Sequence, residues 1–393
     1  MSHHNTVLSQ LLKFIPRHEF DPLAKQHHTG QKLRKMSRWA QFVTMSVAQL
    51  SGRASLRDVV DNVRVQTKRM YHLGMNTISR STLARVNEQQ PYTLYQAVFL
   101  KLLQRCQSMA PKHGFKFNNA LYSLDSTTID LCLSVFPWAK FRSTKGAIKL
   151  HCGLDHSGYL PTFIHITNGK THDIQVARAL KLPKHSIVAV DRAYTDYAWY
   201  NQLNCNDIYF VTRLKSHAKY SVIERRTVNK SSGLTCDQTI QLNGTKAKDC
   251  PVPLRRVGYR DPETGKSYYC LTNNFALAAK TIADIYKARW QVEIFFKTIK
   301  QNLKIKSFLG TSPNAVMTQI WIALTMLLLI TYLKFCSQAA ISFQHILRLL
   351  QLNLFALRDL LGLIVGEPPG DSEPSPQTQF KFSLYLWDSN ASR

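Results

Sequence analysis

Three acidic residues occur in surroundings where a carboxylate could take part in chemistry. Asp125 lies within LDSTTID, a segment with strand character, and Asp191 ends the short apolar segment SIVAVD. Glu293 lies in the helical pattern IADIYKARWQVEIFFKTIKQNLKI. A carboxylate among strand residues is costly to desolvate unless it meets a cation or a donor. Ligands also gather at the carboxyl ends of strands in α/β sheets. All three are therefore candidate site residues.

The helical segment around Glu293 carries its polar residues on one side. At roughly 100° per residue, Tyr286, Arg289, Glu293, Lys297 and Lys300 fall within about 80° of one another. The opposite side is apolar, with Ile285, Ala288, Val292 and Ile299. Arg289 and Glu293 are i,i+4 partners, so an ordinary salt-bridge network remains an alternative to a functional face.

The segments that must position Asp125 and Asp191 alternate between strand and helix patterns. Strands are predicted at ALYSLDSTTIDLCL, AIKLHCGLD, YLPTFIHITNG, SIVAVD and IYFVTRL, and short helices at HDIQVARAL and TDYAWYNQL. The order of three strands, helix, strand, helix and strand matches an RNase H-like α/β core. Periodicity alone does not distinguish this core from other mixed folds. Asp130, five residues after Asp125, would face the opposite side of the sheet.

The flanking regions have different patterns. Residues 1 to about 115 predict several helices with a strong basic bias, which suits a DNA-binding module or a solvated basic face. The stretch 216–275 is polar and rich in strand patterns separated by Gly, Asn and Pro. The expected organisation is a helical DNA-binding domain at 1–115, the first part of the core at 116–215, a β-rich insertion at 216–275, the last part of the core at 276–365, and a flexible Pro-rich tail at 366–393.

The charge balance of the chain is strongly basic. Its 393 residues contain 51 Lys and Arg against 24 Asp and Glu, a formal net charge of +27. Such an excess indicates a polyanionic partner, with solubility or attraction to an anionic membrane as the alternatives. A hydrophobic content of 45% excludes wholesale disorder, and the length excludes a small disulfide-stapled scaffold.

One uncharged segment, 316–333, is about the length of a membrane span. Because polar residues interrupt it and no second such stretch accompanies it, we expect a buried helix that backs the Glu293 helix inside the core, rather than an anchor. The N-terminus lacks the pattern of a secretory signal, and eight dispersed cysteines are typical of reduced, mostly buried thiols. The expected location is the cytoplasm, in association with the nucleoid.

The spacing on the Glu293 helix resembles that of a known family. DDE transposases of the insertion-sequence-four type have a Y-(2)-R-(3)-E-(6)-K signature. It is matched by Tyr286, Arg289, Glu293 and Lys300, which are separated by two, three and six residues. That family also has an Asp in the first core strand and a second Asp after the fourth, followed by a small and an aromatic residue. LDSTTID and VAVDRAY fit these contexts. The resemblance covers about 118–335 clearly and the helical N-terminus loosely.

The resemblance implies a fold and a reaction. The fold would be α/β, an RNase H-like catalytic core with a β-rich insertion, preceded by an all-helical N-terminal domain. Asp125, Asp191 and Glu293 would be catalytic and would bind Mg²⁺ or Mn²⁺, as two ions, through oxygen ligands. Water would first cleave the element end, and the resulting 3′-hydroxyl would attack a second phosphodiester. The partners would be double-stranded DNA, as inverted-repeat ends and target, and a second copy of the chain in a synaptic homodimer, with no membrane.

The resemblance also assigns DNA-binding residues. Tyr286, Arg289 and Lys300 would contact phosphates near the cleaved end, and Lys297 shares their face. Trp290 could stack on an unpaired base, with core packing as the alternative. His151, His172 and Asp173 are interpreted as hydrogen-bonding or helix-capping residues rather than ligands.

The interpretation favoured by these residues is a cut-and-paste DNA transposase. An RNase H-like metal-dependent nuclease that does not join DNA, an inactive DNA-binding relative, and a membrane-anchored protein remain alternatives. The complete set of three carboxylates argues against an inactive relative. The basic helices at the N-terminus argue for a dedicated module that recognises DNA ends.

Overall fold

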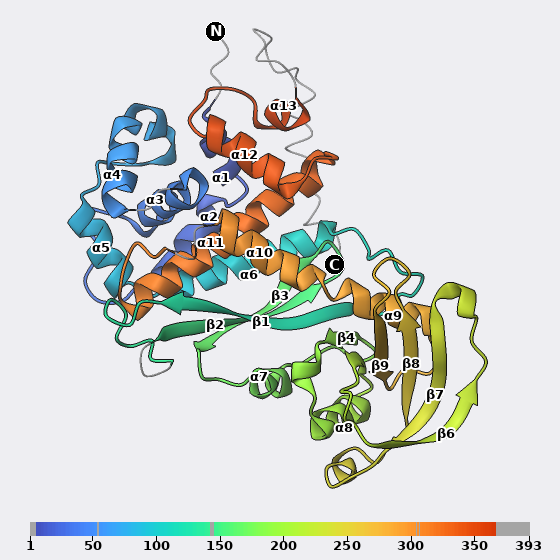
Figure 1. The fold of residues 1–393 in the computed structure, drawn as a ribbon. Coiled ribbons are helices and arrows are strands. Elements are labelled where there is room, and N and C mark those ends of the chain that lie inside the picture. Colours follow the sequence, from blue (N-terminus) through green and yellow to red (C-terminus); the bar gives the residue numbers. More distant parts are fainter. Residues whose placement is uncertain (1–4, 53–54, 142–144, 304, 306, 367–393) are drawn as a thin grey trace. The chain divides into compact units, whose positions relative to one another are not determined.

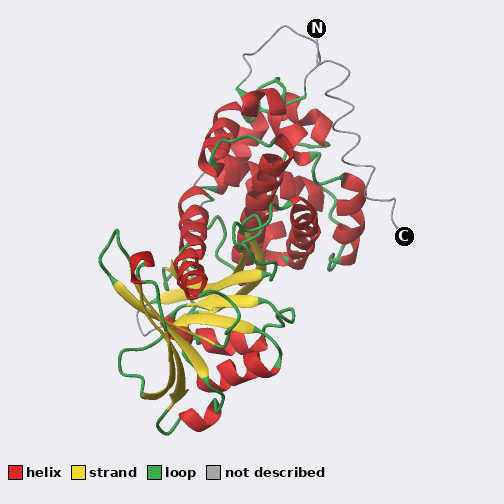
Figure 2. Cartoon of the chain, turned by 90° about the vertical axis from the view of Figure 1, so that its right-hand side faces the viewer, coloured by secondary structure: helices red, strands yellow, loops and turns green. Residues whose placement is uncertain are grey.

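The computed structural model describes residues 5–366, apart from 53–54, 142–144, 304 and 306. The expected tail therefore lies, from residue 367 on, outside the described residues. The chain divides into two compact units. We call residues 1–106 with 302–393 the helical unit and residues 107–301 the sheet unit. In Figure 2 the helices of the one and the strands of the other are easily told apart.

The sheet unit is built on a single nine-stranded sheet in the order β3-β2-β1-β4-β5-β9-β8-β7-β6. Strands β1, β4 and β5 are parallel neighbours, and all other pairs are antiparallel. The strands are β1 Leu121–Leu131, β2 Gly146–Asp155, β3 Leu160–Asn168, β4 Ile187–Val190, β5 Tyr209–Arg213, β6 Tyr220–Arg226, β7 Leu234–Leu242, β8 Leu254–Arg260 and β9 Ser267–Thr272. The strands predicted between 118 and 275 are thus confirmed. The β-rich stretch 216–275 continues the same sheet as β6–β9.

Helices cover both faces of the central strands (Figure 1). Along β4, Val188 and Val190 pack in one apolar cluster with side chains of α7 (Asp173–Ala179) and α8 (Tyr197–Cys205). Ile187 and Ala189 pack in a second cluster with α9 (Ala279–Ala288). Because successive side chains of a strand point to opposite faces, a strand buried on both faces is apolar throughout, as IVAV is. Short 3-10 turns complete the unit: η2 Arg192–Tyr194, η3 Lys230–Ser232 and η4 Ala247–Asp249.

The segment predicted as one long helix around Glu293 consists of two helices. α9 ends at Ala288, and α10 (Gln291–Asn302) begins after a turn at Arg289 and Trp290. Hydrogen bonds that span three residues instead of four mark the junction. The N–H of Trp290 donates to the carbonyl of Lys287, and the N–H of Glu293 donates to the carbonyl of Trp290. Bonds of this i→i+3 type are characteristic of 3-10 turns. The interruption places Arg289 and Trp290 at a junction rather than in the middle of a helix.

The helical unit contains nine α-helices within the described residues. They are α1 Val7–Leu12, α2 Arg17–Gln26, α3 Arg38–Ser51, α4 Leu56–Val65, α5 Arg80–Gln89, α6 Thr93–Met109, α11 Pro313–Ser337, α12 Phe343–Asn353 and α13 Leu360–Val365, with the 3-10 turn η1 Thr67–Leu73. Serine hydroxyls cap several of the starts by accepting a backbone N–H: Ser37 for α3, Ser55 for α4 and Ser79 for α5. The predicted N-terminal helices are confirmed.

Helix α11 contains the uncharged segment, and 89% of its most apolar eighteen-residue window is buried. It packs against α3, α5 and α12. The expectation that this helix backs the Glu293 helix within the catalytic core differs from the observed division, which assigns α11 to the helical unit. Its apolar length is explained by burial on all sides among other helices. By length and composition alone it could also cross a membrane.

The eight cysteines are all free. Four are buried, two are partly buried and two are exposed. Burial raises the pKa of Cys106 and of Cys270 to about 12. The buried thiols are therefore protonated at neutral pH and pack as small apolar side chains.

Candidate active site

Asp125 and Asp191 are brought together by the register of two parallel strands. Leu124 of β1 is paired with Val190, the last residue of β4. The aspartates are the next residues along the chain, so they occupy neighbouring positions where β4 ends and β1 continues to Leu131. Since Leu121 and Ile187 of this pair face α9, alternation predicts the same side for Asp125 and Asp191.

The carboxyl group of Asp125 is mostly buried. Its side chain is 23% exposed, and its Oδ1 accepts the Ser126 N–H at 2.8 Å. Burial raises the pKa of Asp125 to about 6, with further rises from the charges of Asp191 and Glu293 and opposing effects from Ser126 and Arg289. A carboxylate under these conditions is destabilised as an anion. The site is one in which negative charge is concentrated and a cation would be favourable.

Arg289 links two of the three predicted catalytic carboxylates. Its Nη2 lies 2.8 Å from Glu293 Oε1, and its Nη1 lies 3.7 Å from Asp125 Oδ2. The guanidinium is only 11% exposed. The predicted i,i+4 ion pair between Arg289 and Glu293 is therefore present. Arg289 also contacts the carboxylate of Asp125, which belongs to β1. An ordinary solvated salt bridge on one helix face does not account for this third partner.

Asp191 begins the turn that follows β4. Its side chain accepts the N–H of Ala193, and Thr212 donates its hydroxyl to the Asp191 carbonyl at 3.3 Å. Tyr194 follows and is buried, and burial together with nearby carboxylates raises its pKa far above the usual range. The small residue and the aromatic after Asp191 thus have separate uses. Ala193 presents its N–H to the carboxylate, while Tyr194 packs inside the sheet unit.

The remaining residues of the predicted DNA-binding face are distributed around Arg289. The Arg289 guanidinium lies 5.8 Å from the centre of the Tyr286 ring. Lys300 donates to the carbonyl of Thr128 on β1 at 2.8 Å, which ties the end of α10 to the strand of Asp125. Lys297 is exposed. Trp290 is 58% exposed, so core packing, the alternative for this residue, does not describe its position.

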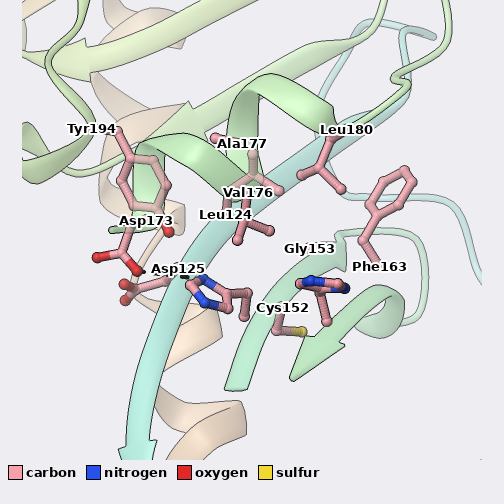
Figure 3. A pocket seen from close by; sticks show the side chains of 12 residues that line it. Leu124, Asp125, Cys152, Gly153, Phe163, Asp173, Val176, Ala177, Leu180 and Tyr194 are labelled. Atoms are coloured by element: carbon pink, nitrogen blue, oxygen red, sulfur yellow. Dashed lines mark ion pairs between the residues drawn. The ribbon is translucent and has the colours of Figure 1, made fainter. Parts of the chain in front are cut away.

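A second polar cluster adjoins the first on the side of α7. Asp173 Oδ1 lies 3.0 Å from Lys149 Nζ and 3.3 Å from His151 Nδ1. Burial by itself would raise the pKa of Asp173, but hydrogen bonds from His151, Ser126 and Lys149 hold it well below its ordinary value. Asp173 and Asp125 line the same small pocket, shown with Tyr194 in Figure 3. The cluster therefore extends the polar surroundings of Asp125 beyond the three predicted carboxylates.

The interpretation of His151, His172 and Asp173 as hydrogen-bonding or capping residues agrees with their contacts. His172 caps α7 by accepting the Ile174 N–H, while His151 bonds the Thr167 hydroxyl at 2.9 Å. Lys149 was not predicted. The signal for it lies in β2, where Lys149 and His151 are two residues apart and therefore face the same side of the sheet.

The three carboxylates suit hard divalent cations in their chemistry. Mg²⁺ and Mn²⁺ prefer carboxylate oxygens, and burial, with smaller contributions from the charges of Asp191 and Glu293, raises the pKa of Asp125 to about 6. As placed, the described residues contain no group of three or more His, Cys, Asp or Glu side chains arranged to hold a metal ion. Arg289 lies between Asp125 and Glu293 instead.

Comparison with known proteins identifies the family of the chain. A family model described as a transposase DDE domain matches residues 119–329, which is more than half of the chain and includes all three carboxylates. The chain belongs to the DDE transposase family. Residues 3–76 match a second model, described as a domain of unknown function (DUF4372). The family therefore spans β1 through most of α11, and the additional domain covers the first helices.

Individual relatives are also named as transposases. A protein of Geobacillus stearothermophilus, named for insertion sequence element IS5377, is 30% identical over 66% of this chain and 68% of its own length. One of Sinorhizobium fredii, y4zB, is 28% identical over 75% and 83%. The solved piggyBac transposase synaptic complex with hairpin DNA is 12% identical, with coverage of 97% and 85% and a TM-score of 0.46. That score is too low to establish a common fold.

Proposed function

We propose that this DDE transposase moves an insertion sequence by a cut-and-paste route and belongs to the insertion-sequence-four type. The observation that carries the proposal is the β1–β4 register. It sets Asp125 beside Asp191, while Arg289 connects Asp125 to Glu293. The first five strands, in the order β3-β2-β1-β4-β5 with only the last three parallel, support an RNase H-like core.

In this proposal the carboxylates of Asp125, Asp191 and Glu293 would hold two divalent ions. The ions would activate the attacking oxygen and stabilise the leaving oxygen in a phosphoryl transfer. The protein positions these ligands on three elements: strand β1, the turn after β4 and helix α10. Ser126 orients the Asp125 carboxylate and Ala193 that of Asp191 through backbone N–H groups.

The cations beside the carboxylates have a different task. Arg289 is held by Glu293 and Asp125, and in a complex its remaining donors would bind a phosphate of the cleaved end. Exposed Lys297 would contribute charge, and Tyr286 and Lys300 would position the strand. Trp290 presents an exposed ring at the α9–α10 junction, which suits stacking against an unpaired base. We propose duplex DNA as substrate, a synaptic homodimer as the active form and the cytoplasm as its location.

Incubation with Mg²⁺ and DNA carrying the inverted repeats that flank the gene tests the proposal. Wild-type protein should cleave at the repeat ends and join the 3′-hydroxyls to a target. Asp125→Asn, Asp191→Asn and Glu293→Gln should each abolish cleavage while leaving DNA binding intact. Asp130→Asn is the matched control, because Asp130 is an exposed aspartate on the same strand β1.

The other outcomes distinguish the alternatives. Cleavage without joining would identify a nuclease, the second candidate, which would use the same carboxylates. Binding without any cleavage, unchanged in Asp125→Asn, would refute both enzymatic functions. Cleavage by Glu293→Gln at the wild-type rate would show that Glu293 is not the third catalytic carboxylate.

A further inference from the structure

The helical unit contains a large pocket of about 920 Å³ that is separate from the carboxylates. One wall is the loop 29–36, which joins α2 to α3, and the other is helix α5. We call it the basic pocket, because four of its lining residues are Lys32, Arg34, Lys35 and Arg85. All four are exposed. The pocket lies within the DNA-binding domain expected at 1–115, but none of its lining residues has yet been given a role.

The charge of the basic pocket is of one sign. Among the described residues its lining includes no Asp or Glu, and none of its four Lys and Arg residues forms an ion pair with a described acid. Like charges on facing walls repel one another, so a polyanion between them would be stabilised. The pocket therefore has the properties of an anion site.

A buried polar network holds the two walls together. Gln90, which is 5% exposed, donates to the carbonyl of Thr29 at 2.8 Å and accepts the Arg38 guanidinium at 3.1 Å. Arg38 also donates to the carbonyl of Pro91 at 2.7 Å and stacks on the Tyr95 ring at 5.3 Å. These hydrogen bonds tie the loop to the end of α5, while Arg38 Nε has no hydrogen-bond partner among the described residues. The basic loop is thus pre-organised against α5.

Helix α5 presents one polar stripe to the pocket. Ser81, Arg85 and Gln89 follow one another at i,i+4 spacing, and Thr82 lies beside Ser81. Residues at this spacing share a helix face. Hydroxyl, guanidinium and amide groups are the side-chain donors that contact phosphate oxygens in DNA complexes. The stripe therefore supplies neutral donors next to the cations.

The composition of the lining selects among anionic occupants. The described part of the lining contains no aromatic side chain on which single-stranded bases could stack. Its apolar side chains in that part are Leu33, Met36 and Val86, whereas small-molecule sites are lined predominantly by apolar side chains. We propose that the basic pocket binds the phosphate backbone of duplex DNA. The proposal rests on DNA being the substrate, as proposed above, and it assigns backbone contacts to loop 29–36 and α5.

Fluorescence anisotropy with the full chain, in EDTA to prevent cleavage, tests this proposal. The probe is a labelled duplex of the element end, titrated at several salt concentrations. Each lost phosphate contact should reduce the slope of log K against log salt by about 0.9. Arg85→Ala should thus lower the slope by about 0.9 and the triple variant Lys32→Ala/Lys35→Ala/Arg34→Ala by roughly 2.7. Lys101→Ala, an exposed lysine on α6 outside the lining, should leave it unchanged.

Each result decides the question. Wild-type slopes in the pocket variants would overturn the proposal, as would an equal loss in Lys101→Ala, which would indicate diffuse attraction. Tighter binding of an RNA duplex, or displacement by a free nucleotide, would identify a different occupant. Gln90→Ala removes no charge; it should weaken binding several-fold without changing the slope. Since no cleavage is measured, these results stand apart from the test of Asp125, Asp191 and Glu293.

Discussion

Replacing Asp125 by asparagine should stabilise the folded protein while it abolishes cleavage. The side chain is mostly buried near two other acids, and its pKa rises from 3.8 to about 6. Each unit of pKa corresponds to about 1.4 kcal/mol, so the ionised carboxylate destabilises the metal-free fold by about 3 kcal/mol. Asparagine keeps the acceptor for the Ser126 N–H but carries no charge. Allowing for partial exposure and the lost attraction of Arg289, we expect a gain of about 1–3 kcal/mol at pH 8.

The pH dependence follows from the direction of the shift. A carboxyl group whose pKa is higher in the folded state stabilises the fold below the unfolded value, here 3.8, and this contribution is lost as pH rises through about 6. The difference between Asp125→Asn and wild type should therefore be near zero at pH 3.8, grow up to about pH 6 and remain constant above it.

Urea unfolding in EDTA across this pH range measures the difference, and a second series with Mg²⁺ tests the proposed ligand. Mg²⁺ should stabilise the wild type by about 2.7 kcal/mol at a hundredfold excess over its dissociation constant, and Asp125→Asn much less. Asp130→Asn, exposed on the same strand, should change stability by less than about 0.5 kcal/mol. If Asp125→Asn is less stable than wild type at pH 8 in EDTA, the carboxylate is compensated in the fold and the reasoning is wrong.

Three further predictions concern other parts of the sheet unit. Arg255→Lys should lower the free energy of unfolding in urea by about 3 kcal/mol. Arg255 binds buried Asp237 through two nitrogens at 2.8 and 2.9 Å, and lysine cannot form this two-point contact. An unchanged midpoint would contradict this. Burial lowers the pKa of His156 to about 4, so the free energy of unfolding of the wild type should fall by up to about 3 kcal/mol as pH falls from 6.5 to 4. Thermal unfolding at each pH should show a smaller loss for His156→Gln. Trp290→Ala should leave stability within about 0.5 kcal/mol yet weaken binding to DNA with an unpaired end base roughly tenfold; equal affinities in anisotropy titrations would exclude stacking.

Local patterns were sufficient to predict most of the elements. The alternation in LDSTTID and the apolar run in SIVAVD are read from short stretches, because a strand on a packed sheet needs side chains matched to its faces. The serine hydroxyls before α3, α4 and α5 likewise satisfy N–H groups only a few residues away. These interactions depend on neighbours in the chain, so they can be recognised without the fold.

The break between α9 and α10 could not be predicted in this way. The helical periodicity continues through Arg289 and Trp290, and the backbone donors and acceptors on both sides of them allow a helix there. Packing on two sides decides it: Ile285 is buried against the sheet, while Lys300 is held by the Thr128 carbonyl of β1. The uniform apolar character of α11 likewise shows that it is buried but not which elements bury it.

The sequence by itself determined the types of residue that can do the chemistry and the elements that bear them: two aspartates at strands, a glutamate on a helix, and basic residues beside it. Tertiary structure decided how they meet. The β1–β4 register sets Asp125 and Asp191 at neighbouring positions, and Arg289 reaches across to Asp125 from another element. The basic pocket likewise depends on Gln90, which lies 61 residues after Thr29 and joins the loop to the end of α5. Contacts between distant segments depend on sheet pairing and packing, which no local pattern contains.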